Sequence, residues 1–433
     1  MNAAEQSLRP SPDRRAGASP PGDAPTAEFA RPAEAAAALS APGRLLRRLL
    51  QAFGDPPIEF QLWDGERIST AHAEIAARVR LEDRGVILGL LRDPHVRFGD
   101  AYAEGRLQID GDLVRLMEEV YRGSARANGR KSLLRSLSGL LHRPHTNSLA
   151  GSRENIHHHY DIGNDFYSLW LGPTMAYTCA YYPTESSTLD EAQTAKMHHV
   201  CRKLRLRAGE SVVEAGFGWG TLALHMARHY GVKVRAFNIS HEQVVYARER
   251  ARAEGLASQV EYVEDDYRNI SGRYDAFVSV GMLEHVGVDN YPGLGRVAHR
   301  SLGSNGRGLI HSIGRNQPAP LHPWIERRIF PGAYPPSLGE MAQIFEPSEL
   351  SILDVENLRL HYARTLTHWL ALYEHNVDRV RRMFDEKFVR MWRLYLAGSV
   401  AGFTTGTLQL FQVVFAPREY NDIPLTRAYM YPS

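Results

Sequence analysis

The chain has 433 residues, of which 43% are hydrophobic and 23% are charged, a balance typical of a globular protein with more than one domain. A net charge of +2 excludes a polycation built to coat nucleic acid, and two cysteines exclude a disulfide framework or a cysteine zinc cluster. No apolar run reaches the roughly 18 residues of a membrane span, and the N-terminus lacks the apolar stretch of a secretory signal. These features predict a cytoplasmic enzyme.

The N-terminal part of the chain predicts a leader followed by a small α+β domain. Residues 1–42 are rich in Ala, Pro and Gly, and their prolines interrupt any helix, so we expect a disordered leader. Residues 43–122 predict a domain of short elements. In chain order these are an amphipathic helix over 43–53, strands within 57–68 and 83–98 with a turn at Asp64-Gly65, and a helix over 98–122.

A basic amphipathic linker over residues 123–150 is predicted next. Between residues 121 and 150 the chain carries six basic residues and no acidic one, with leucines at helical spacing. Such a helix can lie on an anionic membrane surface, or it can pack its leucines on a neighbouring domain as an ordinary linker. The sequence leaves both interpretations open.

Strand-like and helical segments alternate over residues 151–433. Strands are predicted at 211–215, 232–237, 260–264, 276–280 and 308–313, with helices beginning near Thr221, His241 and residue 290. This alternation is typical of an α/β fold, in which a parallel sheet carries helices on both faces.

A glycine-rich turn joins the first of these strands to its helix. Gly216, Gly218 and Gly220 allow a tight turn and a close approach of a ligand to the backbone. Glu214 precedes the turn at the carboxyl end of the strand, where ligands of open α/β sheets bind. A carboxylate there repels a pyrophosphate but pairs with an ammonium group, which favours S-adenosylmethionine (SAM) over a dinucleotide. A purely structural turn is the alternative.

Six further segments sharpen the interpretation. They read HYDIGNDFY (159–167), MAYTCAY (175–181), LDEAQTAK (189–196), SVGMLEHVG (279–287), LIHSIG (309–314) and HYARTL (361–366). This ordered set resembles the cyclopropane fatty-acyl-phospholipid synthase family, including the mycolic-acid cyclopropane synthases, over about residues 150–433. Residues 43–122 are similar, through weaker motifs, to the N-terminal lipid-recognition domain of the bacterial phospholipid enzymes.

The resemblance implies both a fold and a reaction. The fold is that of a SAM-dependent methyltransferase, with a Rossmann-like catalytic domain over residues 151–433 behind the small α+β domain. The reaction is transfer of a methylene group from SAM to the cis double bond of an unsaturated phospholipid acyl chain, with bicarbonate as the base. The resemblance also implies a homodimer associated peripherally with the inner membrane surface. We expect no metal, and we expect no nucleic acid because positive charge is concentrated in residues 121–150 and no RNA-binding module is visible.

The resemblance carries over to individual positions. The expected bicarbonate ligands are Glu284, His311 and Tyr362 through their side chains, and Cys179 and Ile313 through their backbones. The expected SAM contacts are Tyr177, Thr178, Gly216, Gly218, Gln243, Tyr267 and Arg268, in addition to Glu214 from the turn.

The expected chemistry explains these residue types. An alkene that attacks the methyl of a sulfonium leaves a carbocation, and a base must then remove a proton so that the ring closes. Water must be excluded because it would quench the cation, whereas aromatic faces stabilise the cation without reacting. A small anion oriented by Glu284, His311 and Tyr362 removes the proton without trapping the cation, as a carboxylate alone would.

Two positions depart from the usual D-x-G-C-G-W-G turn of the family, because Glu214 replaces Asp and Phe217 replaces Cys. A bulky Phe217 leaves SAM binding expected but leaves open a related C-methyltransferase that makes methyl- or methylene-branched chains. An idle lipid-binding protein is a further alternative, against which the intact acid-base residues argue. The tract His157–His159 resembles a metal site, but consecutive residues do not converge on one side of a helix. Five aromatic residues are assigned either to the core or to an acyl tunnel: Trp324, Phe330, Trp369, Trp392 and Phe403.

Overall fold

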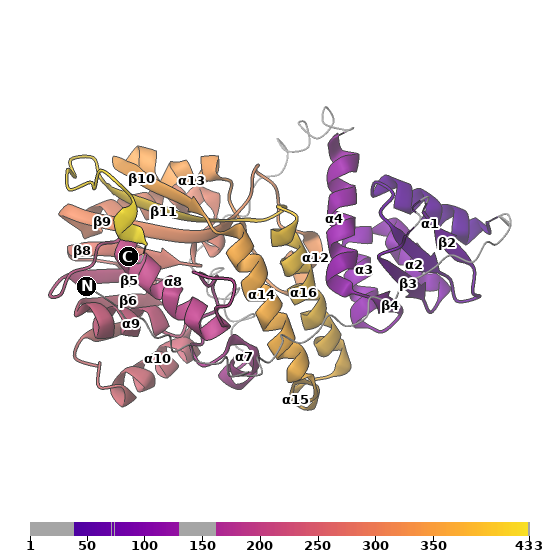
Figure 1. Ribbon diagram of the computed structural model, residues 1–433, viewed down its shortest axis with the longest axis horizontal. Coiled ribbons are helices and arrows are strands. Elements are labelled where there is room, and N and C mark those ends of the chain that lie inside the picture. Colours follow the sequence, from indigo (N-terminus) through magenta and orange to yellow (C-terminus); the bar gives the residue numbers. More distant parts are fainter. Residues whose placement is uncertain (1–38, 71, 73, 130–161, 432–433) are drawn as a thin grey trace, which may run out of the picture.

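The computed structural model describes residues 39–70, 72, 74–129 and 162–431, which form an N-terminal domain and a larger C-terminal domain (Figure 1). The leader up to residue 38, most of the predicted basic linker and the tract His157–His159 lie outside the described residues. No helix in the described ranges is long and apolar enough to cross a membrane.

The N-terminal domain is a four-stranded sheet covered by helices. Its strands are β1 (Ile58–Gln61), β2 (Arg67–Ser69), β3 (Ala77–Leu81) and β4 (Leu107–Gly111), in the order β2-β1-β3-β4. Its helices are α1 (Ala41–Ala52), α2 (Arg84–Arg92), α3 (Pro94–Ala103) and α4 (Leu113–Gly129). Strands β1 and β3 are parallel, and the other neighbours are antiparallel. The expected α+β class of this domain is confirmed.

Several predicted boundaries in this domain are wrong. Helix α1 begins at Ala41, inside the predicted leader, because the Ser40 hydroxyl accepts a hydrogen bond from the Gly43 N–H at 3.1 Å. The predicted strand over 83–98 is instead α2 and α3. The carboxylates of Asp83 and Asp93 accept backbone N–H groups at the N-termini of these two helices.

The predicted helix over 98–122 is interrupted by a strand. Gly105, with φ of 73°, lets the chain turn after α3, and β4 then pairs with β3 before α4 begins. Helix α4 continues without a break to Gly129, so residues 123–129 belong to it and not to a separate linker.

The C-terminal domain is built on a seven-stranded sheet. Its strands are β5 (Ser211–Ala215), β6 (Lys233–Asn238), β7 (Val260–Glu264), β8 (Tyr274–Val280), β9 (Leu302–Gly314), β10 (Leu350–Asn357) and β11 (Gln409–Pro417). The order is β10-β11-β9-β8-β5-β6-β7. The five strands predicted from the sequence are present and mutually parallel, which confirms the α/β fold. The sheet as a whole is mixed, because β11 and β10 were not predicted and each pairs antiparallel with its neighbour.

Helices cover both faces of this sheet (Figure 1). They are α7 (Asn164–Leu171), α8 (Leu189–Lys203), α9 (Thr221–Tyr230), α10 (His241–Ala253), α11 (Tyr291–Ser301), α12 (Pro323–Arg328), α13 (Leu338–Phe345), α14 (Arg359–His375), α15 (Val377–Met383) and α16 (Glu386–Thr404). Five single-turn helices are η1 (Tyr267–Asn269), η2 (Leu283–His285), η3 (Val288–Asn290), η4 (Glu346–Ser348) and η5 (Ala428–Met430). Thr188 and Glu191 form a reciprocal capping box that starts α8.

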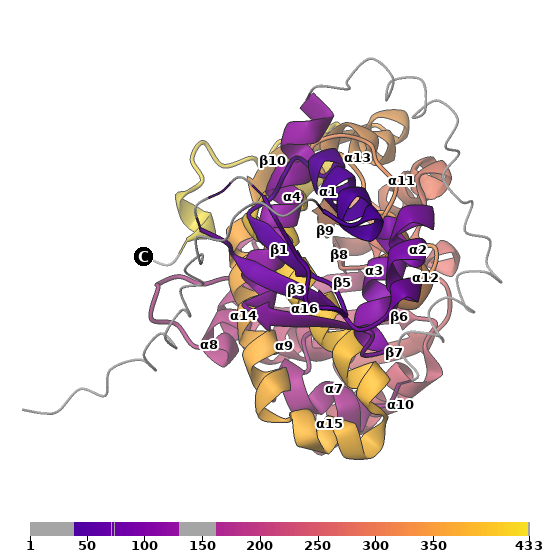
Figure 2. The same ribbon diagram turned by 90° about the vertical axis from the view of Figure 1, so that its right-hand side faces the viewer.

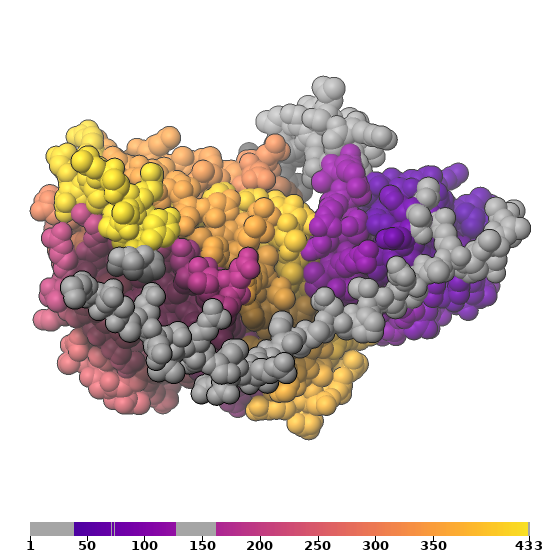
Figure 3. All heavy atoms as spheres, viewed as in Figure 1, coloured from indigo at the N-terminus to yellow at the C-terminus, as the bar shows by residue number. Residues whose placement is uncertain are grey.

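The two domains are docked through α16 and α12 (Figures 1 and 2), and α14 lies between α16 and the large sheet (Figure 1). The space-filling view shows the surfaces of α16 and α4 in direct contact (Figure 3). Arg328 on α12 forms a two-pronged ion pair with Asp100 on α3, with both distances at 3.0 Å. One hydrophobic core runs through both domains, from Leu46 to Trp392. The N-terminal domain therefore contributes to the wall of any cavity that α16 lines.

Candidate active site

Two cavities lie at the carboxyl end of the parallel strands and share a boundary. The first surrounds the glycine-rich turn, and the second extends between the sheet, α14, α16 and the N-terminal domain. The residues that line both are Tyr177, Thr178, Gly281 and His285. A group transferred from a ligand in one cavity to a ligand in the other has to pass this boundary.

The glycine-rich turn lines the first cavity with backbone. Gly216, Gly218 and Gly220 have φ of 82°, 55° and 81°, a left-handed conformation that side chains disfavour. A Cβ at Gly216 would lie 2.8 Å from the Cβ of Met282. No atom lies within 4 Å of a Cβ built at Gly218, so the open space there faces the cavity that a ligand would occupy. The turn therefore fits a ligand that contacts its backbone.

Glu214 and Lys196 place two buried charges in the same cavity. Among the described residues, the Oε2 atom of Glu214 has no hydrogen-bond partner, and burial raises the pKa of this carboxyl to about 8. Burial likewise lowers the pKa of Lys196 to about 8, and its Nζ donates to the Thr178 hydroxyl at 2.8 Å. An amino acid moiety with an ammonium and a carboxylate would complement both charges. Lys196 was not predicted as a site residue, although it ends one of the six motifs.

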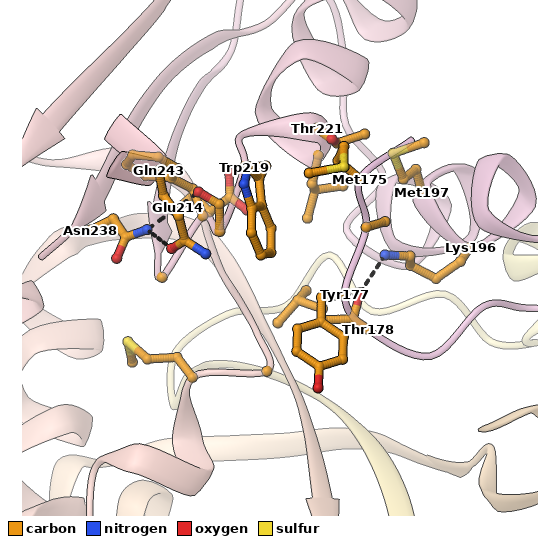
Figure 4. A pocket seen from close by; sticks show the side chains of 18 of the residues that line it. Met175, Tyr177, Thr178, Lys196, Met197, Glu214, Trp219, Thr221, Asn238 and Gln243 are labelled. Carbon is orange, nitrogen blue, oxygen red and sulfur yellow. Dashed lines mark hydrogen bonds between the residues drawn. The ribbon is translucent and has the colours of Figure 1, made fainter. Parts of the chain in front are cut away.

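Figure 4 shows the two sides of this cavity. Glu214, Trp219, Asn238 and Gln243 lie on one side, and Tyr177, Thr178 and Lys196 lie on the other. The Nδ2 atom of Asn238 donates to the Oε1 atom of Gln243 at 2.8 Å, which fixes the amide of Gln243 at the end of β6. The structure thus brings together six of the eight predicted SAM contacts: Tyr177, Thr178, Glu214, Gly216, Gly218 and Gln243.

Tyr267 and Arg268 do not line either of these cavities. They lie in η1, which follows β7, and the Arg268 guanidinium pairs with the Asp266 carboxylate at 3.1 Å. Phe217 does line the first cavity, and its ring packs 4.7 Å from the ring of Tyr262 in the core. The substitution of Cys by Phe217 is therefore accommodated largely by core packing.

The second cavity has a volume of about 420 Å³ and a mainly apolar lining. All five residues predicted to hold an anion line it: Cys179, Glu284, His311, Ile313 and Tyr362. They come from the loop before α8, from η2, from β9 and from α14, so only the fold brings them together.

Glu284 carries a carboxylate that is only half satisfied. Its Oε1 atom accepts the Ile313 N–H at 2.6 Å, whereas its Oε2 atom is buried and has no partner in the described part of the chain. Burial raises the pKa of Glu284 to about 7. The Ile313 N–H is thus engaged in positioning Glu284, and this differs from the expected direct backbone role of Ile313.

His311 is held in one tautomer by a neighbour that was not predicted. The Gln412 side-chain amide on β11 donates to Nδ1 at 2.9 Å, so the neutral ring carries its proton on Nε2. Burial lowers the pKa of His311 well below its ordinary value. Its Nε2 atom has no hydrogen-bond partner in the part of the chain that the structure describes. His311 is therefore a neutral donor at the cavity wall.

The remaining two predicted residues, Cys179 and Tyr362, also lie in the cavity wall. Burial raises the pKa of the Cys179 thiol, and its Sγ atom contacts the Ala180 carbonyl at 3.1 Å, so Cys179 is not a thiolate nucleophile. The Tyr362 ring packs on Phe403 with the ring centres 4.6 Å apart.

The structure also separates core aromatic residues from cavity-lining ones. Phe330 and Phe403 line the second cavity, whereas Trp324, Trp369 and Trp392 are buried in the core outside its lining. His95 on α3 and Tyr121 on α4 bring the N-terminal domain into the cavity wall. Neither residue has a sequence signal that connects it with a site whose other residues begin more than 50 positions later in the chain.

Residues 147–413 match the family described as mycolic acid cyclopropane synthetase. The chain belongs to this family. Residues 45–131 match a domain described only as a domain of unknown function.

Similar proteins support an enzyme that uses SAM. The chain is 35% identical, over 87% of its length and 96% of the relative, to the "Probable fatty acid methyltransferase" of Pseudomonas putida. It is 38% identical, over 62% of its length and 69% of the relative, to the cyclopropane-fatty-acyl-phospholipid synthase of Escherichia coli. A solved structure of the mycolic acid cyclopropane synthase CmaA1 with SAH and CTAB superposes with a TM-score of 0.58 at 27% identity, over 61% of this chain and 97% of that one. This member of the cyclopropane synthetase family is thus a SAM-dependent methyltransferase acting in fatty-acyl modification.

Proposed function

We propose that this enzyme transfers a methylene group from SAM to the cis double bond of unsaturated phospholipid acyl chains, with bicarbonate as the base. The observation that carries the proposal is the boundary between the two cavities. A cavity that contains the buried ionisable groups of Glu214 and Lys196 meets a larger, mainly apolar cavity at Thr178 and Gly281, and the apolar cavity contains the unpaired atoms of Glu284 and His311. An apolar chain in the second cavity would present its double bond at this boundary.

The first cavity has the features that a SAM site needs. Glu214 would accept the ammonium group, Lys196 would face the carboxylate, and Gly216 and Gly218 would contact the ligand through their backbones. SAM supplies an electrophilic methyl group when bound. Tyr267 and Arg268 have less support as SAM contacts, because the Arg268 guanidinium is already paired with the Asp266 carboxylate.

The unpaired atoms of Glu284 and His311, together with the nearby Tyr362 hydroxyl, fit a small anion that carries an O–H group. The His311 Nε2–H and the Tyr362 hydroxyl would donate to its oxygens, and the Glu284 Oε2 atom would accept its O–H. Bicarbonate supplies the proton-accepting base when bound. The apolar lining formed by residues such as Phe330 and Phe403 excludes water, which would quench a cation.

We also propose that the enzyme acts at the cytoplasmic face of the inner membrane. The surface of the N-terminal domain supports contact with lipid. Leu88 and Leu91 on α2 are 71% and 43% exposed, and Arg92 follows them. They precede His95, which is exposed and lines the apolar cavity, so this apolar surface adjoins the cavity. Apolar side chains beside basic ones suit a membrane interface. We further propose a homodimer, as the family resemblance implies.

A second candidate is a fatty-acyl C-methyltransferase that makes methyl- or methylene-branched chains. It is favoured by the names of two relatives, the Pseudomonas putida protein and the tuberculostearic acid methyltransferase UfaA1 of Mycobacterium tuberculosis, which is 36% identical over 60% of this chain and 64% of the relative. Phe217, where the family pattern has Cys, is the residue in the first cavity that could alter the outcome.

The experiment that tests the proposal mixes the purified protein with methyl-labelled SAM and vesicles of cis-monounsaturated phospholipid, and identifies the acyl product by proton NMR. Upfield ring protons are the expected result. Methylene or methyl-branch signals would instead support the second candidate, and Phe217→Cys would then test whether residue 217 decides the product. Absence of label in the lipid would contradict both.

A further inference from the structure

Arg315 is a cation in the wall of the apolar cavity that the proposed chemistry does not use. It follows Gly314 at the end of β9, and its backbone is fixed because its N–H donates to the Pro336 carbonyl at 2.8 Å. The side chain lines the cavity, and its Nε atom is buried without a hydrogen-bond partner in the described ranges. An arginine with a buried, unsatisfied donor is costly unless a ligand supplies the acceptor.

The nearest acidic and phenolic groups are already engaged or neutral. Glu340 accepts the Tyr334 hydroxyl at 2.8 Å with Oε1 and the Ser337 N–H at 2.8 Å with Oε2. Tyr121 packs against the same region from α4, and burial raises its pKa, so it stays uncharged. Within the described residues Arg315 has no carboxylate within 4 Å. The charge of Glu340 reaches Arg315, but Glu340 forms no ion pair with the guanidinium, so the buried Nε donor stays unsatisfied by the described residues.

Two histidines line the cavity at its basic end, beside Arg315. Burial lowers the pKa of His322 to about 4, so its ring is a neutral hydrogen-bond donor there. His322 and His95 both line the cavity, with their ring centres 5.5 Å apart, and His95 is exposed. The acidic residue beside them, Asp93, is occupied in capping α3 and in pairing with Arg327 at 3.5 Å. The exposure of His95 indicates that the basic end is the end that opens to the surface. An anionic group attached to an apolar chain would enter there.

We propose that Arg315, together with His95 and His322, binds the phosphodiester of the lipid substrate while the acyl chain occupies the apolar cavity. The inference rests on the proposed function and extends it to the head of the substrate. A planar guanidinium suits a phosphodiester because it donates two parallel hydrogen bonds to adjacent oxygens. Arg315 lies two residues beyond Ile313, which positions Glu284, and both residues line the same cavity. Head group and reacting bond are thus bound in one cavity, and the N-terminal domain completes the head-group site through His95.

The test compares lipids that share an acyl chain but differ in charge. Dioleoylphosphatidylglycerol, dioleoylglycerol and oleate are presented in the same neutral detergent micelles to the full-length wild type, Arg315→Gln and Arg315→Lys. We expect Arg315→Gln to lower kcat/KM for the phospholipid by about ten- to a hundredfold through KM, as loss of a charge-assisted pair does. The kcat/KM for dioleoylglycerol should be unchanged, and Arg315→Lys should restore part of the loss.

Arg327→Gln is the matched control, because Arg327 is an exposed arginine on α12 with the same charge and no place in the cavity lining. An equal loss in Arg327→Gln would show general attraction to an anionic surface and overturn the proposal. An equal loss with dioleoylglycerol would show a structural role and also overturn it. A loss confined to oleate would assign the charge to a carboxylate.

A binding measurement separates failure of this inference from failure of the proposed function. Calorimetric titration with short-chain dihexanoylphosphatidylglycerol does not depend on turnover or on SAM. Tighter binding to the wild type than to Arg315→Gln supports the subsite even if no lipid is methylated. Equal binding to both, with unchanged thermal stability, contradicts it.

Discussion

Glu284 shows how burial of one carboxylate couples its charge to pH. One oxygen is held by the Ile313 N–H, the other has no partner among the described residues, and burial raises the pKa to about 7 from an ordinary 4.5. The group can accept a proton from an anion only when it is ionised. Near neutral pH a small change in environment therefore decides whether it can act.

We predict that Glu284→Gln lowers turnover by about 10²–10⁴-fold, because an acceptor of the base's proton is lost. SAM affinity should stay within about twofold, since Glu284 lies outside the first cavity. For the wild type, kcat/KM should rise with pH through about 7 as Glu284 ionises, and this limb should vanish in the variant. Full activity in Glu284→Gln would contradict the assignment.

The same pKa has a consequence for stability. Because the folded-state pKa of Glu284 is raised, its contribution is present below the ordinary value of 4.5 and is lost as pH rises through about 7. The Tm of the wild type should therefore fall more than that of Glu284→Gln between these pH values. Parallel Tm curves would argue against a buried, shifted carboxyl.

At the scale of elements, close contacts at glycine decide how helices cover the sheet. Helix α11 packs against α13, and Gly295 faces the backbone carbonyl of Ile344 so closely that a Cβ would overlap it. Gly293, on the same helix, has only the far end of the Arg296 side chain within 4 Å of a Cβ. A side chain therefore has room at Gly293 but none at Gly295, although both glycines lie on α11.

We predict opposite effects of alanine at these two positions. Gly295→Ala should lower the free energy of unfolding by about 1–3 kcal/mol or more, because the helices must move apart. Gly293→Ala should raise it by about 0.5–1 kcal/mol, because alanine favours the helix. Urea denaturation of both variants measures the difference, and equal effects would refute the packing argument.

For the whole molecule, the decisive feature is that the N-terminal domain forms part of the wall of the apolar cavity. Its His95 and Tyr121 line the wall, and its helices α3 and α4 pack on α16. Gly99 on α3 lies against Trp324 on α12 so closely that a side chain would overlap the indole ring. Loosening this contact should affect the lipid cavity and leave the SAM cavity intact.

We predict that Gly99→Ala reduces lipid methylation by about tenfold, because displacement of Trp324 opens the cavity to water. SAM affinity measured by calorimetry should be unchanged. Gly89→Ala is the matched control, since a Cβ there would make ordinary contacts with Arg97 within the N-terminal domain. Equal methylation by the wild type and both variants would show that domain docking does not matter for turnover.

The sequence by itself determined the features that depend on local order. Short apolar runs predict the five parallel strands. The glycine-rich turn follows from the left-handed backbone conformation at Gly216 and Gly220, which glycine allows. Both signals act within a few residues. The strand predicted around the run VILGLL (residues 86–91) was wrong, because a short apolar run is compatible with a helix as well as with a strand.

Only the tertiary structure decided features that join distant residues. The antiparallel strand β11 brings Gln412 to His311, α14 brings Tyr362 to Glu284, and the N-terminal domain brings Tyr121 towards Arg315. Each pair is separated by more than 75 residues, and local periodicity carries no information on such pairs. The same packing keeps Tyr267 and Arg268 outside the cavities and leaves the Arg315 Nε atom without a hydrogen-bond partner among the described residues. The physical reason is that burial and charge pairing are set by neighbours in space, which the chain acquires only on folding.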